Sequence, residues 1–428
     1  MLGRCLIGFL LACGLAAQAP PPEPEGLLDL IKSHVGESLR RLPDYTCLQT
    51  IERYERRRSS REFVLSDRLR LEVALVEGKE YFAWPGETKF EVSRITQLVP
   101  GGTIGNGNFA LHAYSVFLST APEYAYGGET VLGGRRVIRY DFRVPRAKSG
   151  YTLRVGERQA VVGFRGSFYV DRDTLDLVRL EVVAEEIPPV LGVDHAADSM
   201  EYRPVRIGEK EFVLPAASEL LLRDDDGSEY RNRTSFSRCR QYTGESVLSF
   251  AGPLEEIAPG GGAPALRRVA LPPGLTVGLA LETAVDSAQA AVGDAIEARV
   301  TGDVKKDGVV WVPKGARARG RITRLARRNS PVAHYEVGLR FDTVEFPAGS
   351  SDFPAVLEAV LTAGGISTSQ SAAGRLPAVG GRRVAIAVLQ PEDGLGSGFL
   401  IVTGTRLLLP KGLQMMWRTM ARQEEQKR

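Results

Sequence analysis

The stretch GSFYVDRDTLDLVRLEVV, residues 166–183, indicates the fold class of the first half of this chain. Two runs rich in aromatic and branched aliphatic residues, 166–170 and 175–183, flank the polar sequence from Asp171 to Thr174. Runs of this length and composition form strands, and polar residues such as these form the turns between them. The stretch therefore predicts a β-hairpin.

Similar patterns predict further strands on both sides of this hairpin. Downstream, two more hairpins are expected at residues 201–207 and 211–214 around Gly208, and at residues 220–223 and 229–236 around the turn 224–227. Upstream, alternating sequences predict strands at residues 46–56, 69–73, 79–84 and 136–144. Strands at this spacing are typical of an antiparallel sheet.

Helices are expected only near the start of the chain. Apolar residues recur at helical spacing from Leu27 to Leu39, and Pro43 ends the segment, which predicts a helix over residues 25–41. A second, shorter helix is expected over residues 108–118. The first half is therefore predicted to be a mainly β domain, residues 25–250, with one face of its sheet covered by helix.

A segment rich in Gly and Pro, residues 251–268, is interpreted as a linker to a second domain, residues 269–420. About eight short strands are expected there, which is typical of a small β-barrel or sandwich. The expected strands are residues 275–281, 295–304, 309–312, 316–328, 335–345, 382–389, 399–403, 405–409 and 413–419. Residues 363–381 are expected to form a mobile loop, and residues 421–428 a charged tail.

The first residues have the pattern of an export signal. Arg4 precedes an apolar run of 13 residues, Cys5 to Ala17, which is too short to cross roughly 30 Å of hydrocarbon as a helix. We expect residues 1–19 to be a signal peptide that is cleaved near Ala16–Ala19. An alternative stays open, because Leu10-Leu-Ala-Cys13 is similar to a lipobox, and lipidation at Cys13 would anchor the chain to a membrane.

Removal of the signal leaves two cysteines, Cys47 and Cys239, in the folded part. Two cysteines in an oxidising compartment favour one disulfide, and two separate buried thiols are the alternative. The chain has no Cys-x-x-Cys sequence, so neither a redox dithiol nor a zinc knuckle is indicated.

The charge pattern gives no indication of nucleic-acid binding. The net charge is +3 over 428 residues, and acidic and basic residues are interleaved. One concentration of basic residues follows the first expected strand and comprises Arg53, Arg56, Arg57 and Arg58. These arginines either contact anionic lipid headgroups or form an ordinary solvated face.

No catalytic or metal-binding motif is found, and we expect no enzyme activity and no cofactor. The four histidines lie in different segments, and none has a partner at metal-ligand spacing. Asp194-His195 is the most suggestive pair, although a polar loop is the simpler interpretation. The turn 171–176 is acidic, but it lacks the glycine and final glutamate of an EF-hand. The acidic sequence 224–227 is interpreted as a turn, with a weak cation site as the alternative.

The hairpin residues Gly166–Asp171, together with Thr174 and Leu177–Leu180, resemble a hairpin of the LolA-like lipoprotein-carrier superfamily. Members are periplasmic half-barrels, in which a curved antiparallel sheet is capped by helices on its concave face and holds acyl chains. The resemblance covers roughly residues 25–250. It implies the same half-barrel here and a lipid or lipoprotein as partner.

The second half resembles a different family, the C-terminal β-barrel of TrbI-like proteins of type IV secretion and conjugation. The resemblance rests on residues 271–277, 292–294, 312–316 and 320–321, and the sequence from Leu409 to Gly412 repeats the Pro-Lys-Gly turn. It implies a barrel and assembly into rings. The family's N-terminal membrane helix and its outer-membrane insertion are absent, so only the barrel is expected here.

Together these features predict a non-enzymatic envelope protein, periplasmic or associated with the outer membrane. In one hypothesis it binds a lipid or lipoprotein, or acts as a scaffold for an envelope partner. In the other it is a structural module that forms homo-oligomers and binds no ligand. An envelope hydrolase of unrecognised type is the third and least favoured hypothesis.

Overall fold

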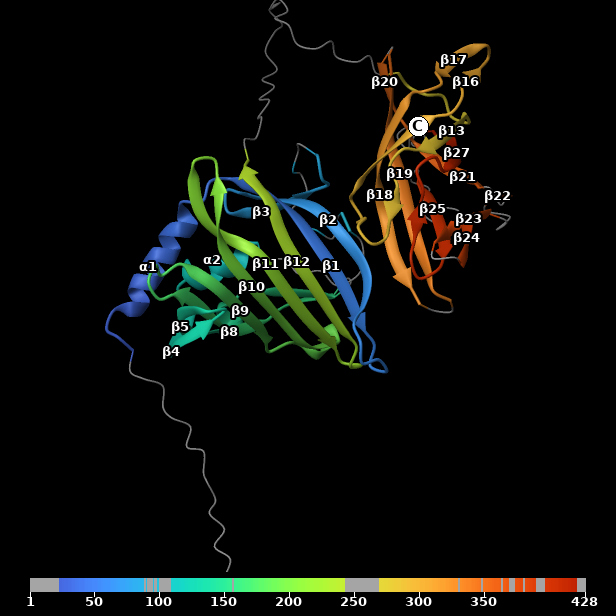
Figure 1. Ribbon diagram of the computed structural model, residues 1–428. Coiled ribbons are helices and arrows are strands. Elements are labelled where there is room, and N and C mark those ends of the chain that lie inside the picture. Colours follow the sequence, from blue (N-terminus) through green and yellow to red (C-terminus); the bar gives the residue numbers. More distant parts are fainter. Residues whose placement is uncertain are drawn as a thin grey trace, which may run out of the picture.

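A computed structural model gives the arrangement of two large antiparallel sheets (Figure 1). It describes residues 23–87, 90, 95, 98–99, 109–155, 158–242, 269–329, 332–347, 349–362, 365–368, 374–379, 382–389 and 397–421. The expected signal peptide with Cys13 and the expected linker 251–268 lie outside these residues.

The first sheet has ten strands, in the order β3-β2-β1-β12-β11-β10-β9-β8-β5-β4. Its strands are β1 (Tyr45–Arg56), β2 (Val64–Val76), β3 (Lys79–Ala83), β4 (Glu123–Leu132), β5 (Arg135–Val144), β8 (Gly163–Asp171), β9 (Leu177–Glu185), β10 (Val193–Ile207), β11 (Lys210–Asp224) and β12 (Glu229–Gln241). A small separate hairpin consists of β6 (Thr152–Val155) and β7 (Arg158–Val161). The three hairpins expected from the sequence are confirmed as β8–β9, β10–β11 and β11–β12.

Two helices cover one face of this sheet. Helix α1 (Leu27–Arg40) contributes the apolar stripe that the sequence predicted, and helix α2 (Leu111–Phe117) is the shorter helix. Both pack in one cluster with inward-facing side chains of β5, β8, β9 and β10. The first half is therefore a curved half-barrel sheet whose concave face is capped by helix, as the sequence analysis expected.

Strand β11 is longer than the sequence suggested. Residues 211–214 and 220–223 were expected to be separate strands, yet one strand runs through both and includes Pro215. Proline is tolerated there because the ladder with β10 shifts register between Glu201 and Tyr202, opposite Pro215, and β12 pairs only from Ala217 onward. The bulge thus removes the need for an amide at this position.

A disulfide joins Cys47 of β1 to Cys239 of β12, with the two Cα atoms 4.1 Å apart. The ladder between these strands shifts register between Thr46 and Leu48, next to the bridge. The covalent link spans 192 residues of sequence. In the loop-closure model, cross-linking a loop of this length stabilises the fold by about 5 kcal/mol.

Removing this bridge should lower the stability of the first sheet. We expect Cys47→Ala combined with Cys239→Ala to reduce the free energy of unfolding by about 2–5 kcal/mol, because the unfolded chain regains its loop entropy. Urea denaturation followed by tryptophan fluorescence measures this loss. A reductant should weaken the wild type and leave the double variant unchanged; equal sensitivity of both proteins would contradict the assignment.

The second sheet has eleven strands and curls until its edge strands β22 and β23 approach each other. Its strands are β13 (Thr276–Leu281), β15 (Ala295–Val300), β18 (Arg317–Arg328), β19 (His334–Phe346), β20 (Gly349–Asp352), β21 (Ala355–Thr362), β22 (Gly365–Thr368), β23 (Gly374–Val379), β24 (Arg382–Leu389), β25 (Gly398–Thr403) and β27 (Gln414–Thr419). Two short ladders pair β14 (Val285–Asp286) with β26 (Leu408–Leu409), and β16 (Val304–Lys306) with β17 (Val309–Val312). A barrel-like second half is thus confirmed, with Trp417 fully buried between Phe341 and Phe353.

Part of the expected mobile loop 363–381 is instead strand, since β22 and β23 lie within it. The sequence predicts no element for residues 349–362, where the structure has β20 and β21. The sequence of β21, AVLEAVLT, has apolar residues whose spacing fits a helix as well as a strand. Its pairing with β27 decides between the two.

The two sheets meet along a free part of strand β2. Strand β3 pairs only with residues 72–76 of β2, so the preceding residues would be an open edge. Val292, from the segment before β15, fills this edge through a parallel bridge opposite Leu69, with hydrogen bonds of 2.8 Å to Arg70 and Arg68. The bridge satisfies backbone groups that would otherwise favour aggregation.

Side chains reinforce this junction. Arg70 forms an ion pair with Asp294, and Arg321 of β18 forms another with Glu87, at 2.9 Å. The guanidinium of Arg321 also lies over the ring of Trp84, 5.6 Å from its centroid. The junction therefore combines a backbone bridge, two ion pairs and a cation–π contact.

Gly293 is the position where the junction tolerates least change. Its φ is +99°, and a Cβ atom there would lie 2.2 Å from the carbonyl oxygen of Arg70 and 2.8 Å from the Trp84 ring. We expect Gly293→Ala to lower the free energy of unfolding by about 2 kcal/mol or more, and to speed amide exchange at Arg70 and Val292. Urea denaturation and hydrogen exchange measure the two effects.

Gly274→Ala is the matched control, because Gly274 also has a positive φ, +82°, but has no atom within 4 Å of the added Cβ. It reports backbone strain without the clash. If both variants lost the same stability and neither changed exchange at Val292, the junction would not depend on the close approach at Gly293.

Candidate binding site on the concave face

The concave face of the first sheet is an apolar surface beneath α1 and α2. Its wall consists of large side chains that point inward from four neighbouring strands. They are Ile138, Tyr140, Phe142, Phe164, Phe168, Val170, Leu177, Leu180, Val182, Met200 and Tyr202. The aromatic rings contact one another, as in the stacked pair of Tyr140 and Phe168 with centroids 5.4 Å apart. Such a surface suits an apolar ligand, provided that the helices can be displaced.

Helix α1 covers this wall with three buried side chains, Ile31, Val35 and Leu39. Its polar contacts to the sheet lie at the rim, where His34 Nε2 is 2.8 Å from Asp176 Oδ1 and the Lys32 ammonium lies over the Tyr124 ring. Exposed contacts of this kind contribute roughly 0–1 kcal/mol each. The helix is therefore held mainly by its apolar stripe.

A narrow crevice follows the seam between α1 and the sheet. Its volume is about 20 Å³, which is comparable to a single water molecule. It is lined by His34, Val35, Ser38, Leu39, Asp176, Leu177, Tyr202 and Val213. The interior is thus closely packed with α1 in this position, and a larger ligand needs α1 to move.

A buried acid–base pair lies beneath α2. His112 of α2 and Asp198 of β10 are only 5% and 4% exposed, and His112 Nε2 lies 4.0 Å from Asp198 Oδ2. Neither His112 Nε2 nor Asp198 Oδ1 has a hydrogen-bond partner among the described residues. The ring of Tyr151 packs edge-on against His112, with the ring centroids 5.2 Å apart.

Burial shifts the protonation of both members of this pair. Desolvation raises the pKa of Asp198 to about 7 and lowers the pKa of His112 to about 4. Desolvation also raises the pKa of Tyr151 and of Tyr202, and the Asp198 carboxylate adds to both increases. Near neutral pH the interior beneath α2 therefore holds a neutral imidazole beside a carboxyl group in mid-titration.

The buried pair should make the stability of the fold depend on pH. The fold favours protonated Asp198, so its contribution to stability is present below pH 3.8 and is lost as the pH rises through about 7. His112 acts in the opposite sense, because its contribution is present above pH 6.5 and is lost as the pH falls through about 4. The two trends largely cancel in the wild type between these values.

Replacing Asp198 should reveal the pH dependence of stability that the two groups cancel in the wild type. We expect Asp198→Asn to gain stability relative to the wild type as the pH rises from 4.5 to 8, by about 3 kcal/mol. Urea denaturation at several pH values measures the difference. Asp194→Asn, on the exposed side of β10 where Asp194 pairs with Arg223, is the control and should not show this trend. A pH-independent effect of Asp198→Asn would contradict the buried titration.

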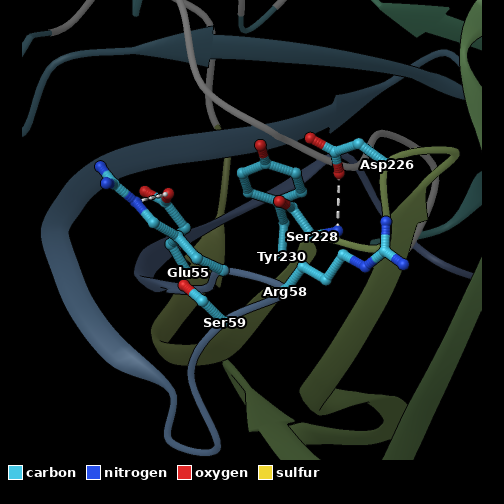
Figure 2. A pocket seen from close by; sticks show the side chains of 7 residues that line it. Glu55, Arg58, Ser59, Asp226, Ser228 and Tyr230 are labelled. Carbon is cyan, nitrogen blue, oxygen red and sulfur yellow. Dashed lines mark hydrogen bonds and ion pairs between the residues drawn. The ribbon is translucent and has the colours of Figure 1, made fainter.

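A second hollow, lined by polar side chains and open to solvent, is found in the first sheet (Figure 2). It has a volume of about 680 Å³ and lies between the β1–β2 and β11–β12 turns. Its lining residues are Glu55, Arg57, Arg58, Ser59, Asp226, Ser228 and Tyr230. Hydrogen bonds from Ser228 lower the pKa of Asp226, and the nearby Arg58 adds to this effect.

The structure places the four predicted arginines along this end of β1 and the turn that follows it. Three of them form ion pairs with carboxylates: Arg53 with Asp67, Arg56 with Glu229, and Arg57 with Glu55. Arg58 lies at the polar hollow. Contact of this surface with anionic headgroups stays a prediction.

The site under α2 was not found from the sequence, which drew attention to Asp194 and His195 instead. Those two residues lie apart from the buried pair, and Asp194 binds Arg223 at 2.8 Å. A usable signal existed, because Ala196, Asp198, Met200 and Tyr202 alternate along β10 on its inward face. A carboxylate in such a register is a buried polar group. Within the described ranges, no group of three or more His, Cys, Asp or Glu side chains could hold a metal ion.

Comparison with known proteins gives only distant likenesses. No known sequence family matches the chain, and no curated protein matches it. A DUF1329 family protein from Desulfovibrio piger is 13% identical and covers 51% of this chain and 94% of its own, at a TM-score of 0.28.

None of the described helices is long and apolar enough to cross a membrane.

Two further solved structures are similar over the same share of the chain. One is a putative outer membrane lipoprotein-sorting protein domain from Vibrio parahaemolyticus, with 12% identity, 50% and 92% coverage and a TM-score of 0.30. The other is a LolA superfamily protein from Nitrosomonas europaea, with 9% identity, 49% and 91% coverage and a TM-score of 0.26. The similarity extends over about half of this chain, and none of these likenesses identifies a ligand.

Proposed function

We propose that this chain is a non-enzymatic protein of the cell envelope that binds the acyl chain of a lipid or lipoprotein on the concave face of its first sheet. The observation that carries the proposal is the apolar wall beneath α1, which that helix covers with three buried side chains and, at its first turn, the partly buried Leu27 and Leu28. The crevice at the seam marks where the cover separates from the wall.

The energies permit such an exchange. Exposing Ile31, Val35 and Leu39 costs roughly 5–9 kcal/mol, at 1.5–3 kcal/mol for each side chain. Burial of an acyl chain contributes about 0.8 kcal/mol for each methylene, so a chain of about 12 methylenes offsets this cost. A short chain of about six methylenes contributes about 5 kcal/mol, which reaches only the lower end of this cost. The proposal therefore implies a dependence of affinity on chain length.

We also propose the surrounding organisation. Residues 1–19 direct export and residues 251–268 link two domains, 25–250 and 269–420. The protein is periplasmic or attached to the outer membrane, and lipidation at Cys13 would attach it directly. The resemblance of the second half to TrbI-like barrels stays a prediction, as do an envelope partner and a homo-oligomeric state.

One observation favours the alternative function, a structural module without a ligand. The interior is closely packed, and the crevice under α1 is no larger than about 20 Å³. A module of this kind would keep α1 in place at all times. The two functions therefore differ in whether α1 leaves the wall.

Filling the seam should separate these functions. We expect Ser38→Trp to lower the affinity for a fluorescent 16-carbon fatty acid by about tenfold or more, since the indole occupies the crevice that a chain must enter. Fluorescence titration of the delipidated full chain measures affinity, and displacement by 8- and 16-carbon acids tests the length dependence.

Leu30→Trp is the matched control, because Leu30 lies on the outer face of the same helix and is 61% exposed. It should bind like the wild type. Native mass spectrometry of protein purified from an envelope fraction then identifies any lipid that is carried. Absence of fatty-acid binding by the wild type would leave the structural module as the function, and equal binding by Ser38→Trp would place the ligand elsewhere.

A further inference from the structure

The β16–β17 hairpin stands apart from both large sheets. Its two strands pair only with each other and join at Asp307-Gly308, where both residues have positive φ, 54° and 78°. The consecutive residues Val309 and Val310 are 54% and 46% exposed. Because consecutive strand residues point to opposite faces, both faces of the hairpin present an apolar side chain to solvent.

The ladder places a lysine beside each of these valines. Lys306 lies opposite Val309, and Lys305 lies opposite Val310. The two pairs are adjacent, so they lie on opposite faces of the hairpin. Each face therefore carries one exposed valine and one exposed lysine side by side.

Cations predominate around the hairpin. Residues 303–317 contain four of them, Lys305, Lys306, Lys314 and Arg317, and two carboxylates, Asp303 and Asp307. Lys305 lies 3.7 Å from Asp303, while Lys306 donates to the carbonyl of Pro273 at 3.4 Å. At the base of the hairpin, the half-buried Trp311 packs against the main hydrophobic cluster and Val312 is fully buried. The hairpin is thus anchored at its base, and its outer part pairs with neither large sheet.

We propose that the β16–β17 hairpin is a contact site for the surface of a membrane that contains anionic phospholipids. A valine enters the boundary between headgroups and acyl chains, while the adjacent lysine extends its ammonium to phosphate. Each lysine near such a surface contributes about 1 kcal/mol. The carboxylate of Asp307 keeps the turn among the headgroups and prevents deeper insertion.

The size of the patch favours a lipid surface over a protein. A stable protein interface buries about 800 Å² on each partner, whereas the exposed apolar part of this hairpin consists of two valines. Peripheral membrane contacts form with less area, since they add electrostatic attraction to shallow burial. In Figure 1 the hairpin lies at the end of the second sheet that points away from the first sheet. Docking there leaves the concave face uncovered.

Co-sedimentation with vesicles tests this site. The full chain carries Cys13→Ser in every sample, so that no acyl anchor contributes. We expect binding to vesicles with about 30% phosphatidylglycerol and little binding to pure phosphatidylcholine. Val309→Ser with Val310→Ser, and separately Lys305→Gln with Lys306→Gln, should each lower the partition coefficient about tenfold or more.

Two matched variants control for general changes. Val131→Ser replaces a valine that is 66% exposed on β4, and Lys210→Gln replaces an exposed lysine next to another hairpin turn. Both should bind vesicles like the parent chain. Asp307→Asn should bind equally or more tightly, because it removes the carboxylate nearest to the lipid.

Vesicle association should not depend on acyl-chain binding at the concave face. The variant Ser38→Trp, which blocks the crevice under α1, should therefore associate with vesicles like the parent chain. Wild-type binding by the double valine variant would overturn the proposal, as would equal binding to neutral and anionic vesicles. Weaker binding by Asp307→Asn would also overturn it, because the turn would then not face an anionic surface. Failure to bind any vesicle, with capture of a protein through the hairpin, would assign the hairpin to a protein partner.

Discussion

Strand β1 lies between β2 and β12, and this position joins parts of the first sheet that are almost 200 residues apart in sequence. Without its pairing to β12, the β1–β2–β3 meander would be an isolated three-stranded ribbon, and β12 would be an open edge. The second sheet docks on β2, so its position depends on the same ladder. The disulfide between Cys47 and Cys239 lies at this ladder and reduces the entropy of the unfolded chain.

Local features of the fold were predictable, and features that depend on distant pairing were not. The hairpin β8–β9 and helix α1 follow from turn residues and apolar spacing within short windows. The parallel bridge between Leu69 and Val292 has no local signal, because each segment alone reads as a strand end and a turn. Likewise the sequence of β21 is ambiguous until β27 pairs with it.

The residues of the candidate site were likewise predictable only where local sequence places them. The inward alternation along β10 was sufficient to place Asp198 on the concave face, but only if the strand began before residue 201. The approach of His112 depends on where α2 crosses the sheet, which no spacing in the sequence defines. The partners of these arginines could not be predicted for a similar reason. Arg53 and Arg56 lie beside Asp67 and Glu229, and these carboxylates come from other strands.

The buried pair also bears on how α2 is retained. Two polar groups in an apolar interior without a hydrogen bond between them are costly, since each loses the water that solvates it in the unfolded chain. This cost is lower when both side chains are neutral. The opposite pKa shifts of Asp198 and His112 keep both groups uncharged between about pH 4 and 7. Above that range the carboxylate ionises beneath α2 and favours entry of water. Helix α1 has no such group among its buried residues, Ile31, Val35, Gly36 and Leu39. Helix α2 therefore contributes a buried titratable side chain, His112, to the interior, whereas the buried side chains of α1 are apolar.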